Sequence, residues 1–186
     1  IREKELLAFP AVVVDSSLAE GISSLAQAHG IGMLRPNTVL MGWPQDTERV
    51  EALWSTLNTI ARLGLNIVCL RFREEPEEAW TAPEGYIDVW WRGRQNGALM
   101  LLLAFLLTKN DEWRGHSIRL IRIIQNEAGR TEVLTHLTKL IEQARIPATP
   151  IVVLSENVPE AVFECSGNSA VVFLGFEVPV TGEEMV

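Results

Sequence analysis

The chain has 186 residues, of which 47% are apolar, and it carries a formal net charge of −8. This apolar content is that of a folded globule and is too high for a disordered chain. The negative charge argues against a nucleic-acid partner and against direct lipid binding, because both need clustered Lys and Arg. We therefore expect a folded acidic domain that binds neither nucleic acid nor lipid.

The two cysteines, Cys69 and Cys165, are too few for a secreted disulfide scaffold, so we expect the chain to reside in the reducing cytoplasm. No secretory leader is recognisable at the start of the sequence. The longest apolar run, Ala98–Leu107, is about half as long as the roughly twenty residues that a bilayer requires. This run predicts a helix buried on all sides, and a membrane-spanning part of the protein would lie outside this sequence.

The first part of the chain alternates short β-branched runs with amphipathic stretches. Ser17 and Glu20 form a capping box, which marks a helix start, and Gly64 stands where a helix is expected to end. In chain order the predicted elements are a strand over 11–14, a helix from Ser17 to the pair Gly30 and Gly32, a strand over 38–41, a helix from Asp46 or Thr47 to Gly64, and a strand over 65–70.

The polar segment Arg71–Gly85 contains two prolines and is the predicted internal boundary, after which the pattern restarts. The elements predicted beyond it are a strand over 86–91, a helix over 97–108, a strand over 117–124, a helix over 128–144, a strand over 151–154, a helical turn over 159–163 and a strand over 170–174. Strands joined by crossover helices predict an α/β fold, with a mainly parallel sheet and helices on both faces. Two similar lobes, 1–80 and 81–186, would fit this order.

The predicted strand ends carry no recognisable catalytic constellation. The sequence has no glycine-rich phosphate loop and no nucleophile elbow, and Cys69 is interpreted as a buried, inert thiol. His29, His116 and His136 lack partners at metal-ligand spacing, and His136 is expected to be half-buried on its helix. We therefore expect no enzyme, no cofactor and no metal.

Trp90 and Trp91 are adjacent in a predicted strand, so they must point to opposite faces of the sheet. Core filling is the favoured interpretation, and contact with a partner is the alternative. Asp88 is the only acidic residue of the same strand, where it could accept hydrogen bonds from backbone amides or pair with Arg35. Arg35, Pro36 and Asn37 are interpreted as a turn that is kept for its shape.

Two segments of the sequence resemble the cytosolic C-terminal domain of cation–chloride cotransporters. The first is 32–44 (GMLRPNTVLMGWP), and the second is 87–91 (IDVWW) followed by 96–107, 110–114 and 118–125. The residues that carry the resemblance are Arg35, Pro36, Asn37, Gly42, Trp43, Asp88, Trp90, Trp91, Asn96 and Gly97. The two blocks occur in the family's order, and the resemblance covers about residues 10–154.

The resemblance implies a universal-stress-protein-like fold, a homodimer, and attachment to the transmembrane domain of the same chain at the cytoplasmic face of the cell membrane. The parent protein would move chloride with sodium and/or potassium, and this part would regulate it. The short segment between Leu154 and Val171 suggests a prokaryotic or trimmed member. The alternative hypothesis is a nucleotide-binding domain of the universal-stress-protein kind, with Asp15 and Gly42 at strand ends that could host an adenine and a ribose.

Overall fold

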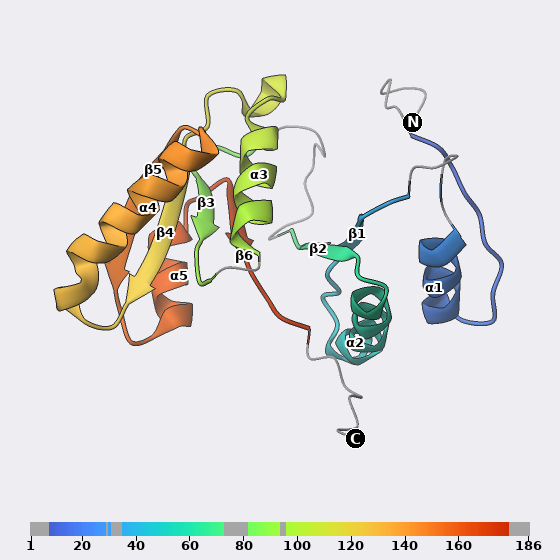
Figure 1. Cartoon of the computed structure of the whole chain (residues 1–186). Coiled ribbons are helices and arrows are strands. Elements are labelled where there is room, and N and C mark those ends of the chain that lie inside the picture. Colours follow the sequence, from blue (N-terminus) through green and yellow to red (C-terminus); the bar gives the residue numbers. More distant parts are fainter. Residues whose placement is uncertain (1–7, 29, 31–34, 73–81, 94–95, 179–186) are drawn as a thin grey trace. The chain divides into compact units, whose positions relative to one another are not determined.

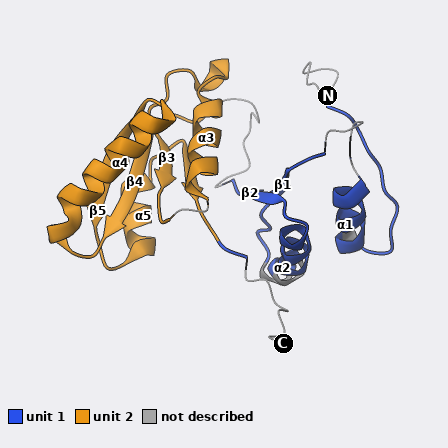
Figure 2. Cartoon of the chain, viewed as in Figure 1, with its two compact units in different colours: residues 1–76, 177–186 blue, residues 77–176 orange. Residues whose placement is uncertain are grey.

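The computed structural model describes residues 8–28, 30, 35–72, 82–93 and 96–178 (Figure 1). The chain divides into two compact units, shown in Figure 2: unit 1 comprises residues 1–76 and 177–186, and unit 2 comprises residues 77–176. His29, Gly32, most of the predicted boundary and the acidic run Glu74–Glu78 lie outside the described residues. Each unit is described by itself.

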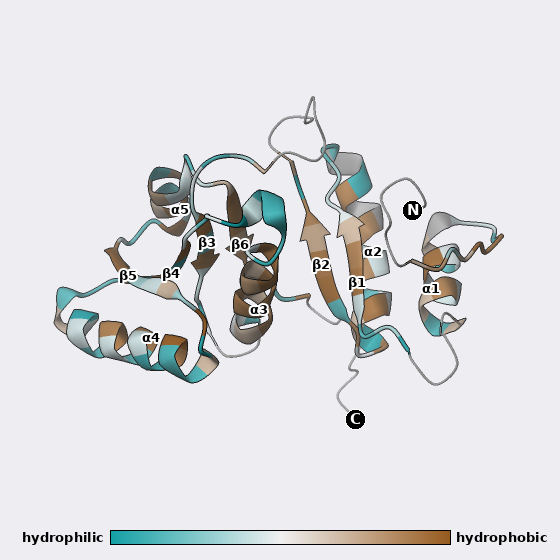
Figure 3. Cartoon of the chain, turned by 90° about the horizontal axis from the view of Figure 1, so that it is seen from above, coloured by the Kyte–Doolittle hydropathy of each residue, from teal (hydrophilic) through white to brown (hydrophobic). Residues whose placement is uncertain are grey.

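Unit 2 contains a four-stranded, all-parallel sheet in the order β5-β4-β3-β6. Its strands and α-helices are β3 (Ile87–Trp90), α3 (Gly97–Leu107), β4 (Ile118–Ile124), α4 (Arg130–Ala144), β5 (Ala148–Leu154), α5 (Val158–Ser166) and β6 (Val171–Leu174). The chain steps from β3 to β4 and β5, and then returns to the other side of β3. Because such crossovers are right-handed, this reversal places α5 on the sheet face opposite α3 and α4 (Figure 3).

Strand β3 is the buried centre of unit 2, and all of its residues are buried. Ile87, Val89 and Trp91 alternate toward the face covered by α3, where they belong to the main hydrophobic cluster. Asp88 and Trp90 therefore alternate toward the face covered by α5. The prediction that the two tryptophans point to opposite faces and fill the core is confirmed, with Trp90 3% and Trp91 9% exposed.

Unit 1 is built from α1 (Leu18–Ala28), β1 (Thr38–Gly42), α2 (Thr47–Arg62) and β2 (Asn66–Leu70). The two strands form a parallel pair whose register runs from Thr38 opposite Asn66 to Gly42 opposite Leu70. Leu57 and Ile60 of α2 are fully buried. The α/β class with mainly parallel sheets that the sequence predicts is thus confirmed.

The helix ends largely follow the sequence signals. The N–H of Glu20 donates to Ser17 Oγ over 3.2 Å, as the predicted capping box requires. Gly64 has φ of +71° and ends α2, also as predicted. The predicted turn at 35–37 is not formed. Asn37 instead extends the β1–β2 ladder by one residue, because its carbonyl accepts a hydrogen bond from the Asn66 N–H.

The predicted strand over 11–14 is wrong. These residues form neither helix nor strand, and the side chains of Val12 and Val14 are 89% and 94% exposed. A β-branched run favours extended backbone, but a strand also needs a neighbour for its N–H and C=O groups. Among the described strands β1 pairs only with β2, so the segment has no strand beside it.

The prediction that the apolar helix is buried on all sides is also wrong. Met100 and Ala104 of α3 are buried against the sheet, whereas Leu102 and Leu106 are 48% and 52% exposed. A helix that covers one face of a sheet has its sheet-facing side enclosed and its other side open. An apolar run alone does not distinguish this arrangement from complete burial.

Strand β5 and helix α5 are longer than the sequence predicts. The predicted strand starts at Ile151, whereas β5 begins at Ala148 and includes Pro150. Proline is tolerated there because β5 is the edge strand beyond β4. The predicted turn over 159–163 is the middle of α5, whose N-terminus is capped by Asn157 Oδ1 accepting the Glu160 N–H.

Candidate functional site

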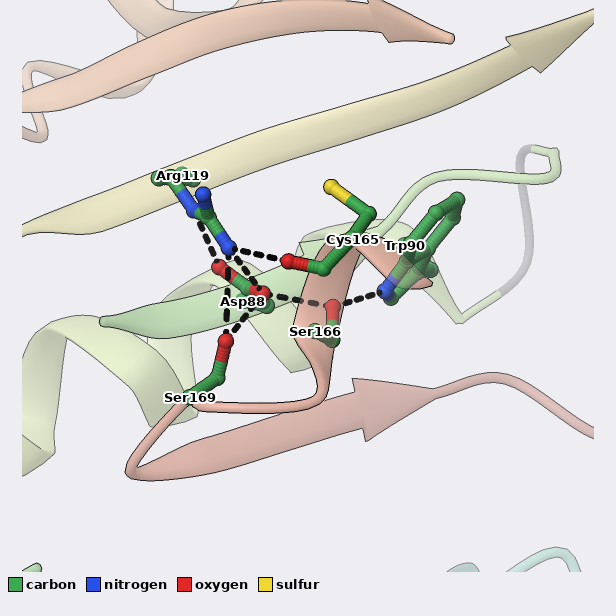
Figure 4. A network of polar contacts seen from close by, with 6 residues as sticks. All are labelled: Asp88, Trp90, Arg119, Cys165, Ser166 and Ser169. Atoms are coloured by element: carbon green, nitrogen blue, oxygen red, sulfur yellow. Dashed lines mark hydrogen bonds and ion pairs between the residues drawn. The ribbon is translucent and has the colours of Figure 1, made fainter. Parts of the chain in front are cut away.

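The candidate site is a polar cluster on the α5 face of the unit 2 sheet. It consists of Asp88, Trp90, Arg119, Ser166 and Ser169, together with the backbone carbonyl of Cys165 (Figure 4). We call these residues the Asp88 cluster. Strand β3 supplies its carboxylate, β4 its guanidinium, and the end of α5 with the turn before β6 supplies both hydroxyls.

Asp88 and Arg119 meet because they are directly opposite each other in the parallel register of β3 and β4. Arg119 Nε donates to Asp88 Oδ1 over 2.7 Å, and Nη2 donates to Oδ2 over 2.6 Å. This two-pronged geometry is the strong form of an arginine–carboxylate pair. The hydrogen bond to Asp88 raises the pKa of the Arg119 guanidinium above its ordinary value, although burial opposes this.

Both serine hydroxyls donate to the same carboxylate oxygen. Ser166 Oγ and Ser169 Oγ each lie 2.5 Å from Asp88 Oδ2. Ser166 Oγ in turn accepts the indole N–H of Trp90 over 2.9 Å, so the tryptophan keeps a partner for its only polar atom although it is buried. The two serines thus join the α5–β6 connection to the centre of the sheet.

The Asp88 carboxylate is held by the chain's own side chains. It accepts four hydrogen bonds, one at Oδ1 from Arg119 and three at Oδ2 from Arg119 and the two serines. Its side chain is also 0% exposed. A general base must reach the proton that it abstracts, so this arrangement fits structural support better than catalysis.

The turn before β6 approaches the sheet closely at Gly85. A Cβ placed there would lie 2.4 Å from the Asn168 carbonyl oxygen, and the residue has φ of +122°. The Ala170 N–H donates to the Tyr86 carbonyl next to this contact. The Arg119 guanidinium lies over the Tyr86 ring, with 4.3 Å from Cζ to the ring centre, so a cation–π contact adds to its hydrogen bonds.

Asn96 and Gly97, which belong to the second family block, lie at the other end of β3. A Cβ on Gly97 would lie 2.4 Å from the Trp91 ring, so only glycine leaves room for that indole. Asn96 Nδ2 donates to the Phe176 carbonyl over 2.8 Å. This is the topological switch point of the sheet, between β3 and β6, where open α/β sheets bind ligands. Here the chain's own residues occupy it.

The residues of the first family block lie in unit 1, at the two ends of β1. Arg35 and Pro36 are exposed before the strand, and Gly42 and Trp43 follow at its carboxyl end. Trp43 packs edge-on against Trp54 of α2, with 6.4 Å between ring centres. The pairing of Arg35 with Asp88 that we considered is wrong, because the ion-pair partner of the fully buried Asp88 is Arg119.

An open pocket of about 400 Å³ lies at the carboxyl ends of β1 and β2. Its lining combines apolar side chains with one cation and one indole: Leu40, Met41, Gly42, Trp43, Gln45, Leu70, Arg71 and Phe72. Of the two strand ends that could host an adenine and a ribose under the alternative hypothesis, Gly42 borders this pocket. Asp15 instead accepts a hydrogen bond from Ser24 Oγ of α1.

The described histidines and cysteines form no reactive group. His136 is exposed, not half-buried, and His116 lies between the carbonyl oxygens of Trp113 and Pro83. Burial raises the pKa of both cysteine thiols, Cys69 and Cys165, above the ordinary value. Within the described ranges, no cluster of three or more His, Cys, Asp or Glu could hold a metal ion.

The sequence singled out Asp88 but missed its partners. Ser166 and Ser169 are 78 and 81 residues away from Asp88 along the chain, and short-range spacing cannot connect them. Arg119 interrupts the apolar strand Ile118–Ile124, and Asp88 interrupts the apolar strand Ile87–Trp90. Each of the two neighbouring parallel strands carries a charge at its second position, and the two charges are opposite. This pattern could have predicted the Asp88–Arg119 pair.

In the part of the chain that the structure describes, the helices are too short or too polar for any of them to span a bilayer.

Comparisons with known proteins agree with the resemblance read from the sequence. The family model for Solute carrier family 12 matches residues 1–77 and 79–164. Potassium/chloride cotransporter 3 of Caenorhabditis elegans is 32% identical over 136 residues, which is 71% of this chain and 12% of that protein. This chain therefore spans only a small part of that relative.

The fold also has a solved counterpart. It is similar to the cytoplasmic domain of a prokaryotic cation chloride cotransporter, with a TM-score of 0.54 and 18% identity over 75% of this chain and 53% of that one. At this identity the likeness concerns the fold alone. Since the family model covers most of the sequence, the chain belongs to solute carrier family 12.

Proposed function

We propose that this chain is the cytosolic regulatory and dimerisation domain of a cation–chloride cotransporter. The parent protein would move chloride together with sodium and/or potassium through a transmembrane domain of the same chain. Support comes from the family match and from the similarity to a potassium/chloride cotransporter. The two similar lobes expected from the sequence remain part of this proposal.

The observation that carries the proposal is the internal pairing of the Asp88 cluster. The carboxylate at the centre of unit 2 is 0% exposed, and all four hydrogen bonds described for it come from the chain's own side chains. The switch point at the other end of β3 is likewise filled by Trp91, Gly97 and Asn96. Polar groups that stabilise the fold are consistent with a domain that acts through contacts with other parts of the protein.

The dimer is tested by sedimentation velocity of the 186-residue chain. We expect a dimer at high micromolar concentration, because the domain leaves large apolar side chains exposed, among them Leu102 and Leu106 of α3 and Phe163 of α5. A chain that stays monomeric at those concentrations would refute dimerisation by this domain.

The regulatory role is tested in the parent cotransporter. Deletion of this domain should reduce the amount of transporter at the cell surface or the chloride-dependent cation uptake. The isolated chain, added to chloride-loaded vesicles, should release no chloride. Surface amount and uptake that both stay at the wild-type level after the deletion would contradict the proposal.

A second candidate function is nucleotide binding at the unit 1 pocket. Open parallel sheets bind ligands at the carboxyl ends of their strands, which is where this pocket lies. Arg71 could face a phosphate, and Trp43 or Phe72 could stack on a base. Against it, the sequence lacks a glycine-rich phosphate loop.

Isothermal titration with ATP and ADP separates the two functions. Binding tighter than about 1 mM that is lost in Arg71→Ala would support the nucleotide site. Arg49→Ala is a matched control, because Arg49 is also an exposed arginine of unit 1 but does not line the pocket. Heats at the level of buffer dilution for both nucleotides would eliminate this candidate.

A further inference from the structure

The outer side of helix α3 is apolar along its whole length (Figure 3). Its sheet-facing residues are buried, and none of its 11 residues has a polar side chain. Ala98, Leu102 and Leu106 recur every four residues and are exposed, and Leu99 and Leu103 beside them are half-buried. Because residues three and four apart lie on one side of a helix, these residues form a continuous stripe, which we call the α3 stripe.

Helix α4 shows what a water-facing helix on the same sheet face looks like. Its exposed side carries Glu132, Thr135 and Lys139 beside Leu134. A helix that packs one side on a sheet normally has polar residues on its other side. Because α3 has none, we expect another surface to cover the α3 stripe.

The C-terminal end of α3 carries one carboxylate without an ion-pair partner. Asp111 is paired with Arg114, and Lys109 lies over the Phe105 ring, 4.3 Å from its centre. Glu112 is exposed and forms no ion pair within the described ranges. A negative charge is unfavourable at the C-terminus of its own helix, so Glu112 would gain from a positively charged group outside the chain.

The N-terminal end of α3 carries the opposite charge. The Trp91 ring packs against Gly97 there, and Arg92, which follows Trp91, is exposed. Arg92 likewise forms no ion pair with a described residue. The first turn of α3 contains no acidic residue, so no carboxylate of the helix compensates the positive end of its dipole. This end therefore attracts a carboxylate.

A second copy of the chain matches all of these features. If a two-fold axis passes beside Leu102, the two α3 helices run antiparallel and each α3 stripe covers the other. The N-terminal end of each helix then meets the C-terminal end of the other, so Arg92 lies beside the partner's Glu112 and the two dipoles oppose each other. The stripe itself carries no charge that would repel its own copy.

A lipid surface matches less well. A helix that lies on an anionic bilayer combines its apolar side with Lys and Arg on its polar side. Helix α3 has no polar side, Glu112 follows its C-terminal end, and the chain has a net charge of −8. Anionic lipid would repel such a chain.

We propose that the α3 stripe is the two-fold interface between two copies of this chain, with the α3 helices antiparallel and Arg92 of each copy paired with the partner's Glu112. The inference rests on the dimerisation proposed above and names the surface that carries it. Burial of the stripe supplies the affinity, whereas the ion pairs at its ends fix the direction of the helices.

Sedimentation velocity of the 186-residue chain tests the stripe. Leu102→Glu puts a charge at the centre of the interface, next to the same charge of the partner, and should raise the Kd of the dimer at least about tenfold. Leu134→Glu is the matched control, because Leu134 is also an exposed leucine of a helix on this sheet face, and it should leave the Kd unchanged. A wild-type urea transition shows that each variant is folded.

Cysteine cross-linking tests the two-fold axis without an added charge. In a chain with Cys69→Ser and Cys165→Ser, Leu102→Cys should form a disulfide-linked dimer on mild oxidation, because residue 102 lies beside the same residue of the partner. Leu134→Cys in the same background should stay a single chain on a non-reducing gel. No cross-link at 102, or equal cross-linking at both positions, would overturn the proposal.

A charge swap tests the direction of the helices. Arg92→Glu and Glu112→Arg should each weaken the dimer, because each places two like charges side by side. The double variant restores opposite charges and should recover the wild-type Kd. A double variant as weak as the single ones would overturn the antiparallel arrangement.

The outcomes separate this interface from the proposed function. A chain that stays monomeric at high micromolar concentration overturns both. A dimer that Leu102→Glu leaves intact overturns the interface alone, and dimerisation through another surface stands. Co-sedimentation of the chain with vesicles of phosphatidylserine and phosphatidylcholine, lost in Leu102→Glu, would assign the stripe to lipid and also overturn the interface.

Discussion

Strands β1 and β3 are both short and mainly apolar, but the two units bury them very differently. All residues of β3 are buried, whereas Leu40 in the middle of β1 is 68% exposed. Strand β3 has β4 and β6 on its two edges and helices on both faces, whereas β1 pairs with β2 alone among the described strands. An apolar pattern thus marks a strand, but the number of its neighbours decides how deeply the strand is buried.

The ion pairs of the two units differ in the same way. The unit 1 pair between Asp46 and Arg49 has side chains that are 68% and 80% exposed, whereas Asp88 and Arg119 in unit 2 are 0% and 17% exposed. Exposed pairs contribute little to stability, but removal of one partner of a buried pair is costly. The same substitution should therefore destabilise unit 2 strongly and unit 1 very little.

The largest expected effect is at Asp88. Asp88→Ala should lower the free energy of unfolding by about 3–5 kcal/mol, because Arg119 then loses its buried partner and two serine hydroxyls lose their acceptor. Asp46→Ala in unit 1 should change it by less than about 0.5 kcal/mol. Urea denaturation measures both, and equal losses would erase the difference between the units.

Two leucine substitutions test the difference in hydrophobic burial between the units. Leu120→Ala in β4, where the side chain is 0% exposed, should cost about 2–5 kcal/mol. Leu40→Ala in β1 should cost less than about 1 kcal/mol, because little apolar surface is removed from contact. If the Leu40 variant is as unstable as the Leu120 variant, β1 is covered in solution.

Two glycines of the family blocks give a smaller contrast. Gly97→Ala forces a Cβ to within 2.4 Å of the Trp91 ring and should cost about 1–3 kcal/mol through overpacking. A Cβ on Gly42 meets nothing within 4 Å, so Gly42→Ala should have almost no effect. Thermal unfolding of the two variants checks this, and a stable Gly97 variant would show that Trp91 can move aside.

The smallest effect concerns the two thiols, of which each unit contains one. Burial raises the pKa of both Cys69 and Cys165, so both carry less thiolate at neutral pH than free cysteine. Both should react slowly with iodoacetamide in the native chain. As urea rises, Cys69 in the two-stranded sheet should react before Cys165, and mass spectrometry of the modified peptides should show this order. The reverse order would mean that unit 1 resists unfolding by urea better than unit 2.

Most of the secondary structure between Thr38 and Leu174 was predictable because each element carries its own period and its own boundary signals. The failure at 11–14 has a physical cause: propensity is local, whereas a strand exists only with a neighbour. The exposed side of α3 was missed for a similar reason, because an apolar run gives no information about which side is covered.

The candidate site was predictable only in part. Asp88 stood out as a charge in an apolar strand, but its pairing with Arg119 depends on the register of β3 and β4. The serines reach the carboxylate only because the chain returns to the other side of β3 after α5. Sequence spacing contains neither the register nor this return.

The most direct test follows Asp88→Asn in the full-length cotransporter that contains this domain. Surface labelling measures the amount of assembled protein, and chloride-dependent uptake measures transport by the same cells. Because the Asp88 cluster joins β3, β4 and the α5–β6 connection, we expect the variant to reach the surface in reduced amount, with uptake per surface molecule equal to the wild type. A variant present at the surface in normal amount but with uptake per molecule lost would contradict a purely structural role for this carboxylate.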